Sequence, residues 1–313
     1  MITNFVDFYA NDQKLKTHYF SSLGEGPFEL KAKYQEIVSN AVSVEVQAGN
    51  TRGKKVLIEE FTGEWCGFCP TAAYNLSLLA SRSDVVIMTA IFSAQRPGDK
   101  YEYKHVDALE RELGINGAPH GLADRREVEG RIQAASINHA EFKPVLDQIE
   151  EIFETPAQLG IAIETELSGS TVTIKPSIKF YEEITSGIYY TIYINENKLD
   201  GTGQANYYSG SPGYQESKFY TQPDILTDYE HNHVLRKNVT DAFGKLIPAS
   251  SVVLNGVYEP SPVDVDLSEY VVENCEIVVF VHQSLRGSGG KSVFNTQMVA
   301  PGESVDYLGT LSK

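Results

Sequence analysis

The stretch from Val56 to Pro70 reads Val-Leu-Ile-Glu-Glu-Phe-Thr-Gly-Glu-Trp-Cys-Gly-Phe-Cys-Pro. Its first half has the continuous apolar character of a buried strand, and its second half leads into residues with helical spacing. Cys66 and Cys69 therefore fall at the first turn of a predicted helix, where one short disulfide can join them. The N-terminus of a helix favours the thiolate form of the first cysteine. The chain is predicted to be built around a dithiol.

A Cys-x-x-Cys pair has two other interpretations, half of a zinc site and a chance pair of buried cysteines. A zinc centre needs two more ligands at short spacing, and none follows Cys69. The third cysteine, Cys275, begins an apolar run that reads as a buried strand, and we expect it to pack as a small apolar side chain. No metal and no organic cofactor is therefore expected at the dithiol.

Length and composition exclude several classes of protein. A chain of 313 residues is too long for one small core and suggests two domains, with an extra N-terminal segment. A net charge of −16 argues against nucleic acid as a partner, because binding phosphates needs a concentrated basic face. Three cysteines are too few for a scaffold held by many disulfides.

The sequence contains no predicted membrane segment. The first residues have neither a basic start nor an unbroken apolar stretch, so they do not make a secretory signal peptide. Nowhere does the chain hold the roughly 18 consecutive apolar residues that a membrane helix needs. Either the protein is used without Sec export, or the numbering begins after a leader.

Three regions are expected along the chain. Residues 1–53 form an N-terminal extension with short strands, which ends in a cluster of turn-forming residues. Residues 54–155 alternate strands and helices, which is typical of an α/β layer structure. The expected strands cover 55–61, 84–92 and 121–124, and the expected helices cover 70–82, 103–113 and 142–153.

The helical period disappears after Pro156. Residues 160–167, 171–181 and 188–195 alternate apolar and polar side chains, which is typical of half-buried strands. We predict an antiparallel, immunoglobulin-like β-sandwich over 156–313. Residues 201–223, rich in Gly, Tyr and Ser, are expected to form a long loop that carries a function or a partner contact.

The motif from Glu60 to Cys69, Glu-Phe-x-x-Glu-Trp-Cys-Gly-Phe-Cys, resembles the thioredoxin-like superfamily. The resemblance implies an α/β thioredoxin-like domain over 54–155. It also implies that Cys66 is the exposed attacking thiol, that Cys69 is the buried resolving thiol, and that Trp65 is an accessory of the site. Cys66 would attack a partner disulfide, and Cys69 would then release the mixed disulfide.

Glu60 falls where thioredoxins place a buried acid that exchanges protons with the resolving thiol. Burial under an apolar strand would raise the pKa of this carboxyl, which suits proton transfer near neutrality. In the alternative interpretation Glu60 points to solvent and Glu59 points inward.

Thioredoxin-like proteins also carry a cis-proline that faces the dithiol, and Ala118-Pro119 has the matching position. A cis bond there would expose backbone groups to a substrate strand. An ordinary trans proline in a loop is the alternative. Phe68 and Pro70 depart from the thioredoxin motif, so the direction of electron transfer stays open.

A second resemblance includes the C-terminal half. The strings from Gly203 to Tyr208 and from Tyr229 to Arg236, together with Asn274-Cys275, resemble the bacterial family named after a 28 kDa outer-membrane protein. Members join a thioredoxin-like domain to a β-sandwich and are usually exported, often as lipoproteins. This chain shows neither a leader nor a lipobox cysteine, so envelope, virion and cytoplasm all stay open.

His231 and His233 could form a metal pair, because residues two apart on a strand point to the same face. Only Asp228 and Glu230 are nearby as further ligands. The favoured interpretation is structural, with both imidazoles hydrogen-bonded to the loop at 201–223.

Two functions follow from these patterns. The first is a thiol-disulfide oxidoreductase acting on protein or small-molecule disulfides through Cys66, Cys69, Glu60 and Pro119. The second is a surface, envelope or phage-virion protein with a structural or interaction role, whose dithiol is a relict or a staple. In that case the tyrosines of residues 201–229 would contact protein partners.

Overall fold

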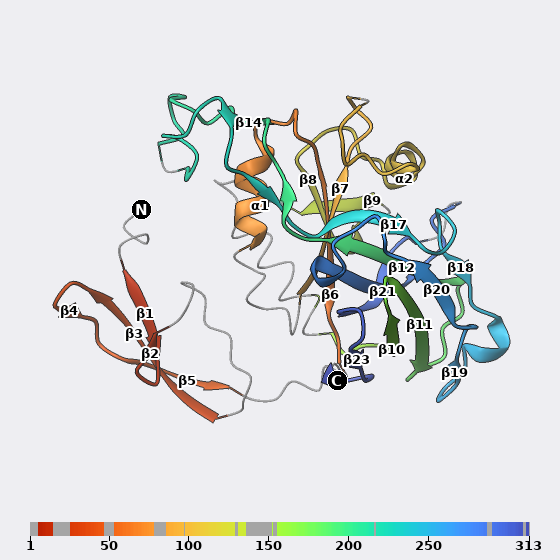
Figure 1. Cartoon of the computed structure of the whole chain (residues 1–313). Coiled ribbons are helices and arrows are strands. Elements are labelled where there is room, and N and C mark those ends of the chain that lie inside the picture. The colour runs from red at the N-terminus through yellow and green to blue at the C-terminus, as the bar shows by residue number, and fades with distance from the viewer. Residues whose placement is uncertain are drawn as a thin grey trace.

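The structure is a computed structural model of the 313-residue chain (Figure 1). It describes residues 6–14, 26–46, 53–77, 86–96, 98–128, 131–135, 152, 155–215, 217–286, 290–308 and 311–312.

The centre of the molecule is β6 (Val56–Thr62), which is buried at every position. It pairs in parallel with β7 (Val86–Phe92), also buried throughout, and antiparallel with β8 (His120–Val128), which pairs with β9 (Arg131–Ala135). Continuous apolar runs suit strands that are covered on both faces.

Two α-helices flank these strands in the described part of the chain. Helix α1 (Cys69–Ser77) follows the end of β6, and α2 (Val106–Leu113) lies between β7 and β8. Leu109 of α2 packs in one core with Leu57 and Phe61 of β6. Helix α2 ends at Gly114, whose φ of 72° is the left-handed conformation of a helix C-cap.

The sheet that contains β6 continues into the C-terminal half. Strand β17 (Val234–Asn238) lies parallel to β7, with Val234 opposite Ala90, and β12 (Ile188–Glu196) and β21 (Cys275–Gln283) follow. Two further strands of this sheet are β22 (Val293–Val299), which pairs with β21, and β18 (Lys245–Leu246), which pairs with β12. Among described strands the order is β22-β21-β12-β17-β7-β6-β8-β9.

A second sheet covers one side of this C-terminal half. Its long hairpin is β10 (Leu159–Ser168) with β11 (Thr171–Phe180), as the alternation predicts, and the turn uses Gly169 at a φ of 61°. Apolar side chains of β10 and β11 share a core with those of β12 and β21. The sheet also holds β19 (Val257–Tyr258), β20 (Val263–Asp266), β23 (Ser304–Val305) and β24 (Leu311–Ser312).

Short elements complete the described structure. The N-terminal strands form their own sheet, and none of them pairs with a described strand of another sheet. They are β1 (Asp7–Ala10), β2 (Gln13–Lys14), β3 (Gly26–Tyr34), β4 (Ile37–Val38) and β5 (Val42–Val46). The remaining pieces are β13 (Leu199–Asp200), β14 (Gln204–Ala205), β15 (Ile225–Leu226), β16 (Glu230–His231) and the 3-10 turns η3 (Ala249–Ser251) and η4 (Val272–Asn274).

The predicted fold class, an α/β thioredoxin-like domain followed by an antiparallel β-sandwich, is wrong. The described residues are mainly β-strand with two α-helices, and no α/β thioredoxin-like core is evident in them. The reason is the pairing of β7 with β17, which joins strands from both halves of the chain into one sheet. The helix predicted over 142–153 lies outside the described residues, except Ile152.

Candidate functional site

Cys66 and Cys69 lie where β6 leads into α1. Two tight turns connect these elements, since the Cys66 N–H donates to the Gly63 carbonyl at 3.0 Å and the Cys69 N–H donates to the Cys66 carbonyl at 3.1 Å. The two cysteines form a disulfide with their Cα atoms 5.3 Å apart. The pairing expected from their spacing is therefore present.

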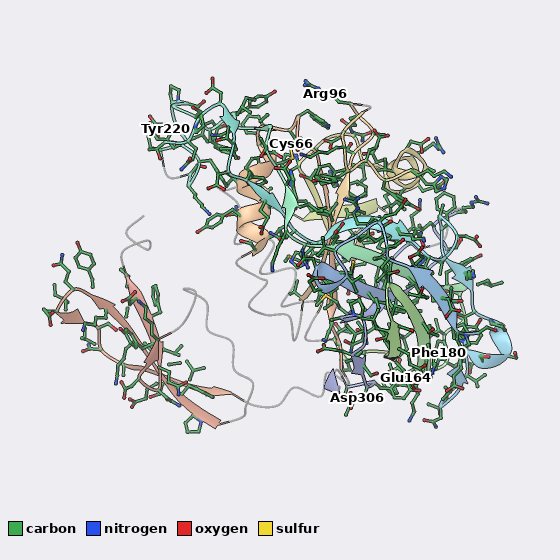
Figure 2. All side chains as sticks on the ribbon, viewed as in Figure 1. Cys66, Arg96, Glu164, Phe180, Tyr220 and Asp306 are labelled. Carbon is green, nitrogen blue, oxygen red and sulfur yellow. A yellow bond between two sulfur atoms is a disulfide. The ribbon has the colours of Figure 1, made fainter. Side chains whose placement is uncertain are left out.

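Both sulfur-bearing residues are buried. Cys69 is 1% exposed, as expected for a resolving thiol, but Cys66 is only 3% exposed. The exposed attacking thiol that the resemblance implied is therefore not seen. Figure 2 draws Cys66 at the same end of the structure as Tyr220, in the long loop of the C-terminal half.

That loop contacts the dithiol through hydrogen bonds. We call residues 203–215 and 217–226 the cap. The Ala205 N–H donates to the Glu64 carbonyl at 2.7 Å, and the Tyr207 N–H donates to the Gly67 carbonyl at 2.9 Å. The amide of Gln204, itself 1% exposed, donates to the Cys66 carbonyl at 3.0 Å. The cap thus binds the backbone on both sides of Cys66.

Aromatic rings of the cap also pack against the dithiol motif. The Phe68 ring lies 5.3 Å from that of Tyr207, 5.5 Å from that of Tyr208 and 6.3 Å from that of Tyr214, measured between centroids. A Cβ atom on Gly67 would lie 2.3 Å from the Tyr207 ring, so a glycine is required at this position. Phe68, a departure from the thioredoxin motif, thus packs against three aromatic rings of the cap.

Trp65 lies just before the dithiol and is partly buried. The guanidinium carbon of Arg96 lies 5.3 Å from the centre of its ring, a cation–π contact. Its indole N–H is buried with no hydrogen-bond partner among the residues described. Because this donor is buried, the Trp65 ring would have to move before its N–H could bind a group from outside the protein.

Glu60 is buried on the α1 side of β6. Desolvation raises the pKa of its carboxyl to about 8, and Oε1 has no hydrogen-bond partner within the described part of the chain. Glu59 is also buried, on the opposite side, where the Arg125 guanidinium donates to its two oxygens at 2.6 and 2.7 Å. Both glutamates are therefore buried, and only Glu60 is left without a charged partner among these residues.

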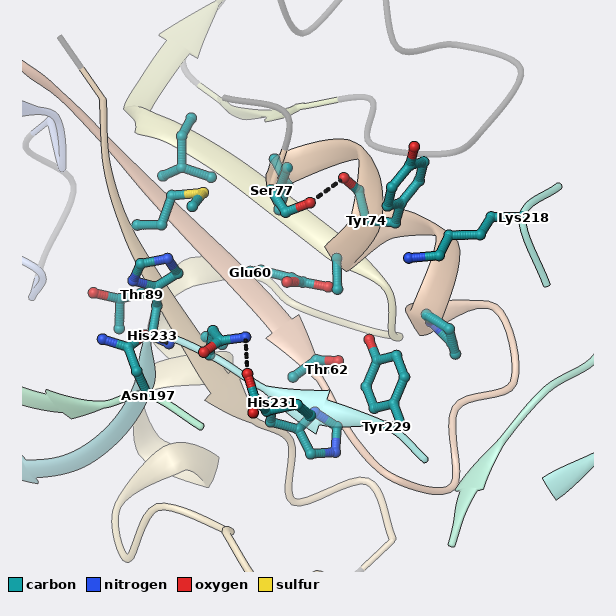
Figure 3. A pocket seen from close by; sticks show the side chains of 18 of the residues that line it. Glu60, Thr62, Tyr74, Ser77, Thr89, Asn197, Lys218, Tyr229, His231 and His233 are labelled. Carbon is teal, nitrogen blue, oxygen red and sulfur yellow. Dashed lines mark hydrogen bonds between the residues drawn. The ribbon is translucent and has the colours of Figure 1, made fainter. Parts of the chain in front are cut away.

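Glu60 faces a cavity of about 350 Å³ between β6, α1 and the C-terminal half (Figure 3). Pro70, the neighbour of Cys69, lines the same cavity, together with Tyr74, Tyr229 and His231. The cavity thus brings the buried acid and the first turn of α1 to one space.

The Ala118-Pro119 peptide bond is cis, as predicted. Pro119 directly precedes β8, in which His120 is the register partner of Phe61 and Gly121 that of Glu60. The proline therefore lies beside the end of β6 from which the dithiol follows.

The two histidines line the same cavity but make different contacts. His231 packs edge-on against Phe92 and Tyr229, with ring centroids 5.0 Å from each. Burial lowers the pKa of its imidazole to about 4, and Nε2 has no hydrogen-bond partner among described residues.

His233 has a φ of 57°, which ends the strand-like alternation on which the metal interpretation depended. Its Nδ1 lies 2.9 Å from a Glu276 oxygen, and its carbonyl accepts the Ala90 N–H at 2.7 Å. No cluster of three or more potential metal ligands occurs in the part of the chain that the structure describes. The expected hydrogen bonds from both imidazoles to the loop at 201–223 are replaced by these contacts.

Sequence reasoning missed Arg125 and the role of Gln204 and Tyr207. An Asp-Arg-Arg run inside a strand is an unusual signal, and Asp124 pairs with Lys54 while Arg125 pairs with Glu59. Gln204 belongs to a string that resembles the family, and Tyr207 was expected to contact a protein partner rather than the dithiol motif. Nothing local could indicate that they contact a motif about 140 residues earlier.

None of the described helices is long and apolar enough to cross a membrane.

Comparison with known proteins gives a family and a fold. No curated protein sequence matches the chain. The structure of HBP35 of Porphyromonas gingivalis is similar in fold, with a TM-score of 0.60 at 18% identity over 83% of this chain and 90% of that one.

A crystal structure of an Agrobacterium tumefaciens protein matches more weakly. Its TM-score is 0.45 at 14% identity, over 79% of this chain and 94% of that one. The sequence model of the family described as outer membrane protein Omp28 matches residues 106–305. This match begins after the dithiol and includes Pro119, the cap and the histidines. Since it spans more than half of the sequence, the chain belongs to the Omp28 outer membrane protein family.

Proposed function

We propose that the chain is a thiol-disulfide oxidoreductase that uses Cys66 and Cys69. The observation that carries the proposal is the disulfide at the first turn of α1, beside a cavity that holds a buried acid with a pKa of about 8. The resemblance of the motif to thioredoxin-like proteins supports the same chemistry.

In the reducing direction the Cys66 thiolate attacks one sulfur of a substrate disulfide. A bond forms between Cys66 Sγ and that sulfur, and the other substrate sulfur leaves as a thiolate that takes up a proton. The Cys69 thiolate then attacks Cys66 Sγ, which releases the second substrate thiol and closes the Cys66–Cys69 disulfide. The substrate gains two electrons and two protons, and the dithiol loses them.

Four neighbours would assist this exchange. Glu60, with its pKa near neutrality, takes the proton of Cys69 before the second attack and returns it in the reverse reaction. The backbone at Pro119 and the ring of Trp65 hold the substrate beside the sulfur. Arg96 fixes the Trp65 ring in place.

The test is a disulfide-reduction assay on the wild type and on Cys66→Ser. We expect turnover with the wild type and none with Cys66→Ser, while Cys69→Ser accumulates a mixed disulfide with the substrate. Cys275→Ser is the matched control. Burial raises the pKa of the Cys275 thiol to about 12, so it stays protonated and this variant should retain full activity. Activity that survives in Cys66→Ser would contradict the proposal.

The second candidate function is that of a surface, envelope or virion protein, in which the disulfide has only a structural role. The 3% exposure of Cys66 and the 1% exposure of Cys69 favour it. The same assay separates the two candidates, because a structural disulfide would resist mild reductant and show no turnover. Membership of the Omp28 family supports a place in the bacterial envelope for either role.

A further inference from the structure

The cap covers the backbone of the dithiol motif. Its hydrogen bonds occupy the carbonyls of Glu64, Cys66 and Gly67, and its Tyr207 ring lies directly on Gly67. Figure 1 shows the segment around β14 beyond the end of β6, where α1 begins. A second polypeptide cannot use the same backbone groups while the cap is bound.

The cap is held in shape by its own contacts. Strand β14 pairs with β15, and the Asn206 amide donates to the carbonyls of Phe219 at 2.9 Å and Pro223 at 3.0 Å. Tyr208, Phe219 and Leu226 are buried in a separate small core. A further contact reaches α1, where the Thr71 and Ser217 hydroxyls are 3.0 Å apart. The cap is therefore a folded part of the molecule that is bound to the motif at several points.

We propose that the cap restricts the dithiol to small-molecule disulfides and excludes protein disulfides. This inference rests on the proposed function. A small disulfide needs only a small opening at Cys66, which is 3% exposed and lies next to the cap residue Tyr207, itself 49% exposed. A protein disulfide brings a chain that must lie along the motif, and the cap already lies there.

The proposed step is the exchange described above with a disulfide of two small thiols. Cys66 Sγ bonds to one of the small thiols and the other leaves as a thiolate; Cys69 then releases the first. Two small thiols and the Cys66–Cys69 disulfide result, and no further reductant is consumed in the single turnover.

Access to Cys66 can be measured without any turnover. In a Cys69→Ser, Cys275→Ser background Cys66 is the sole thiol, and its alkylation rates with iodoacetamide and with a maleimide on a long polyethylene glycol chain are compared. We expect Tyr207→Ala to raise the rate of the large reagent by about tenfold while the small reagent changes by less than about threefold. Gln204→Ala, which removes the amide that binds the Cys66 carbonyl, should act in the same direction.

Tyr220→Ala is the matched control, because this tyrosine lies in the cap but has no ring contact with Phe68 among the contacts described. It should change neither rate. Thermal unfolding of each variant shows that the fold is kept. An unchanged ratio of the two rates in both Tyr207→Ala and Gln204→Ala would overturn the proposal.

Turnover then tests the substrate class. We expect the reduced wild type to react with glutathione disulfide at least about tenfold faster than with the disulfides of insulin, and Tyr207→Ala to narrow this gap. Equal rates of the wild type with both probes overturn the restriction but leave the oxidoreductase intact. No reaction with either probe in any variant overturns the proposed function, while the alkylation rates still decide whether the cap closes Cys66.

Discussion

The two faces of β6 bury neighbouring glutamates in opposite ways. Glu59 lies on the face covered by the C-terminal half, where Arg125 binds both of its oxygens and the guanidinium lies 5.2 Å from the Phe280 ring. Glu60 lies on the face of α1, beside a cavity, with a raised pKa. Residue type and burial are the same, so the partner alone decides which carboxylate is a structural charge and which can exchange a proton.

The largest expected effect is a dependence of stability on pH that comes from Glu60. Its carboxyl has a pKa of about 8 in the folded chain against 4.5 in the reference state, so the protonated form is favoured by folding. The stabilisation is complete below pH 4.5 and is lost as the pH rises toward 8, by up to about 5 kcal/mol. Urea unfolding at several pH values measures this loss.

Glu60→Gln is the control for that measurement, because glutamine keeps the shape and cannot ionise. The variant should lose less stability than the wild type between pH 5 and pH 9, by about 4 kcal/mol. Parallel curves for the two proteins would show that Glu60 is not the group responsible.

Glu59→Gln should give the second largest effect. The substitution leaves the Arg125 guanidinium buried without its anion, which typically costs about 3–5 kcal/mol. The free energy of unfolding at pH 7 measures the loss. Combining Glu59→Gln with Arg125→Met removes the orphaned charge, so the double variant should recover much of the stability. A double variant that is less stable than Glu59→Gln would contradict this account of the pair.

Local features of the site were predictable from the sequence, because each depends on a short stretch. The strand before Cys66 and the disulfide follow from neighbouring residues and their spacing, whereas the cis bond at Pro119 was expected from the resemblance to thioredoxin-like proteins. The partner of Glu59 could not be predicted, since Arg125 is 66 residues away and strand periodicity does not specify which strands pair.

The prediction of the fold class was wrong for the same reason, because it too depended on which strands pair. Runs of apolar residues in β6 and β7 show that both faces are buried, but not which elements cover them or extend the sheet. The pairing of Val234 with Ala90, which makes one sheet from both halves of the chain, has no local signal. The cap was predicted as a loop with a function, and its contact with Cys66 became visible only in three dimensions.

The smallest of these effects concerns the rate of disulfide exchange. If Glu60 takes the proton of Cys69, Glu60→Gln should slow release of the mixed disulfide by about tenfold at pH 7, because general-base assistance is lost. The rate should also lose its inflection near pH 8, where the wild-type carboxyl titrates. Stopped-flow release of a thiol from a Cys66 mixed disulfide measures the rate and its dependence on pH.

Glu64→Gln is the control, because it changes a different carboxylate close to the dithiol. The Glu64 carboxylate pairs with Lys100, and this variant should leave the inflection in place. An inflection that persists in Glu60→Gln would assign the proton transfer to another group and leave Glu60 with no role in exchange.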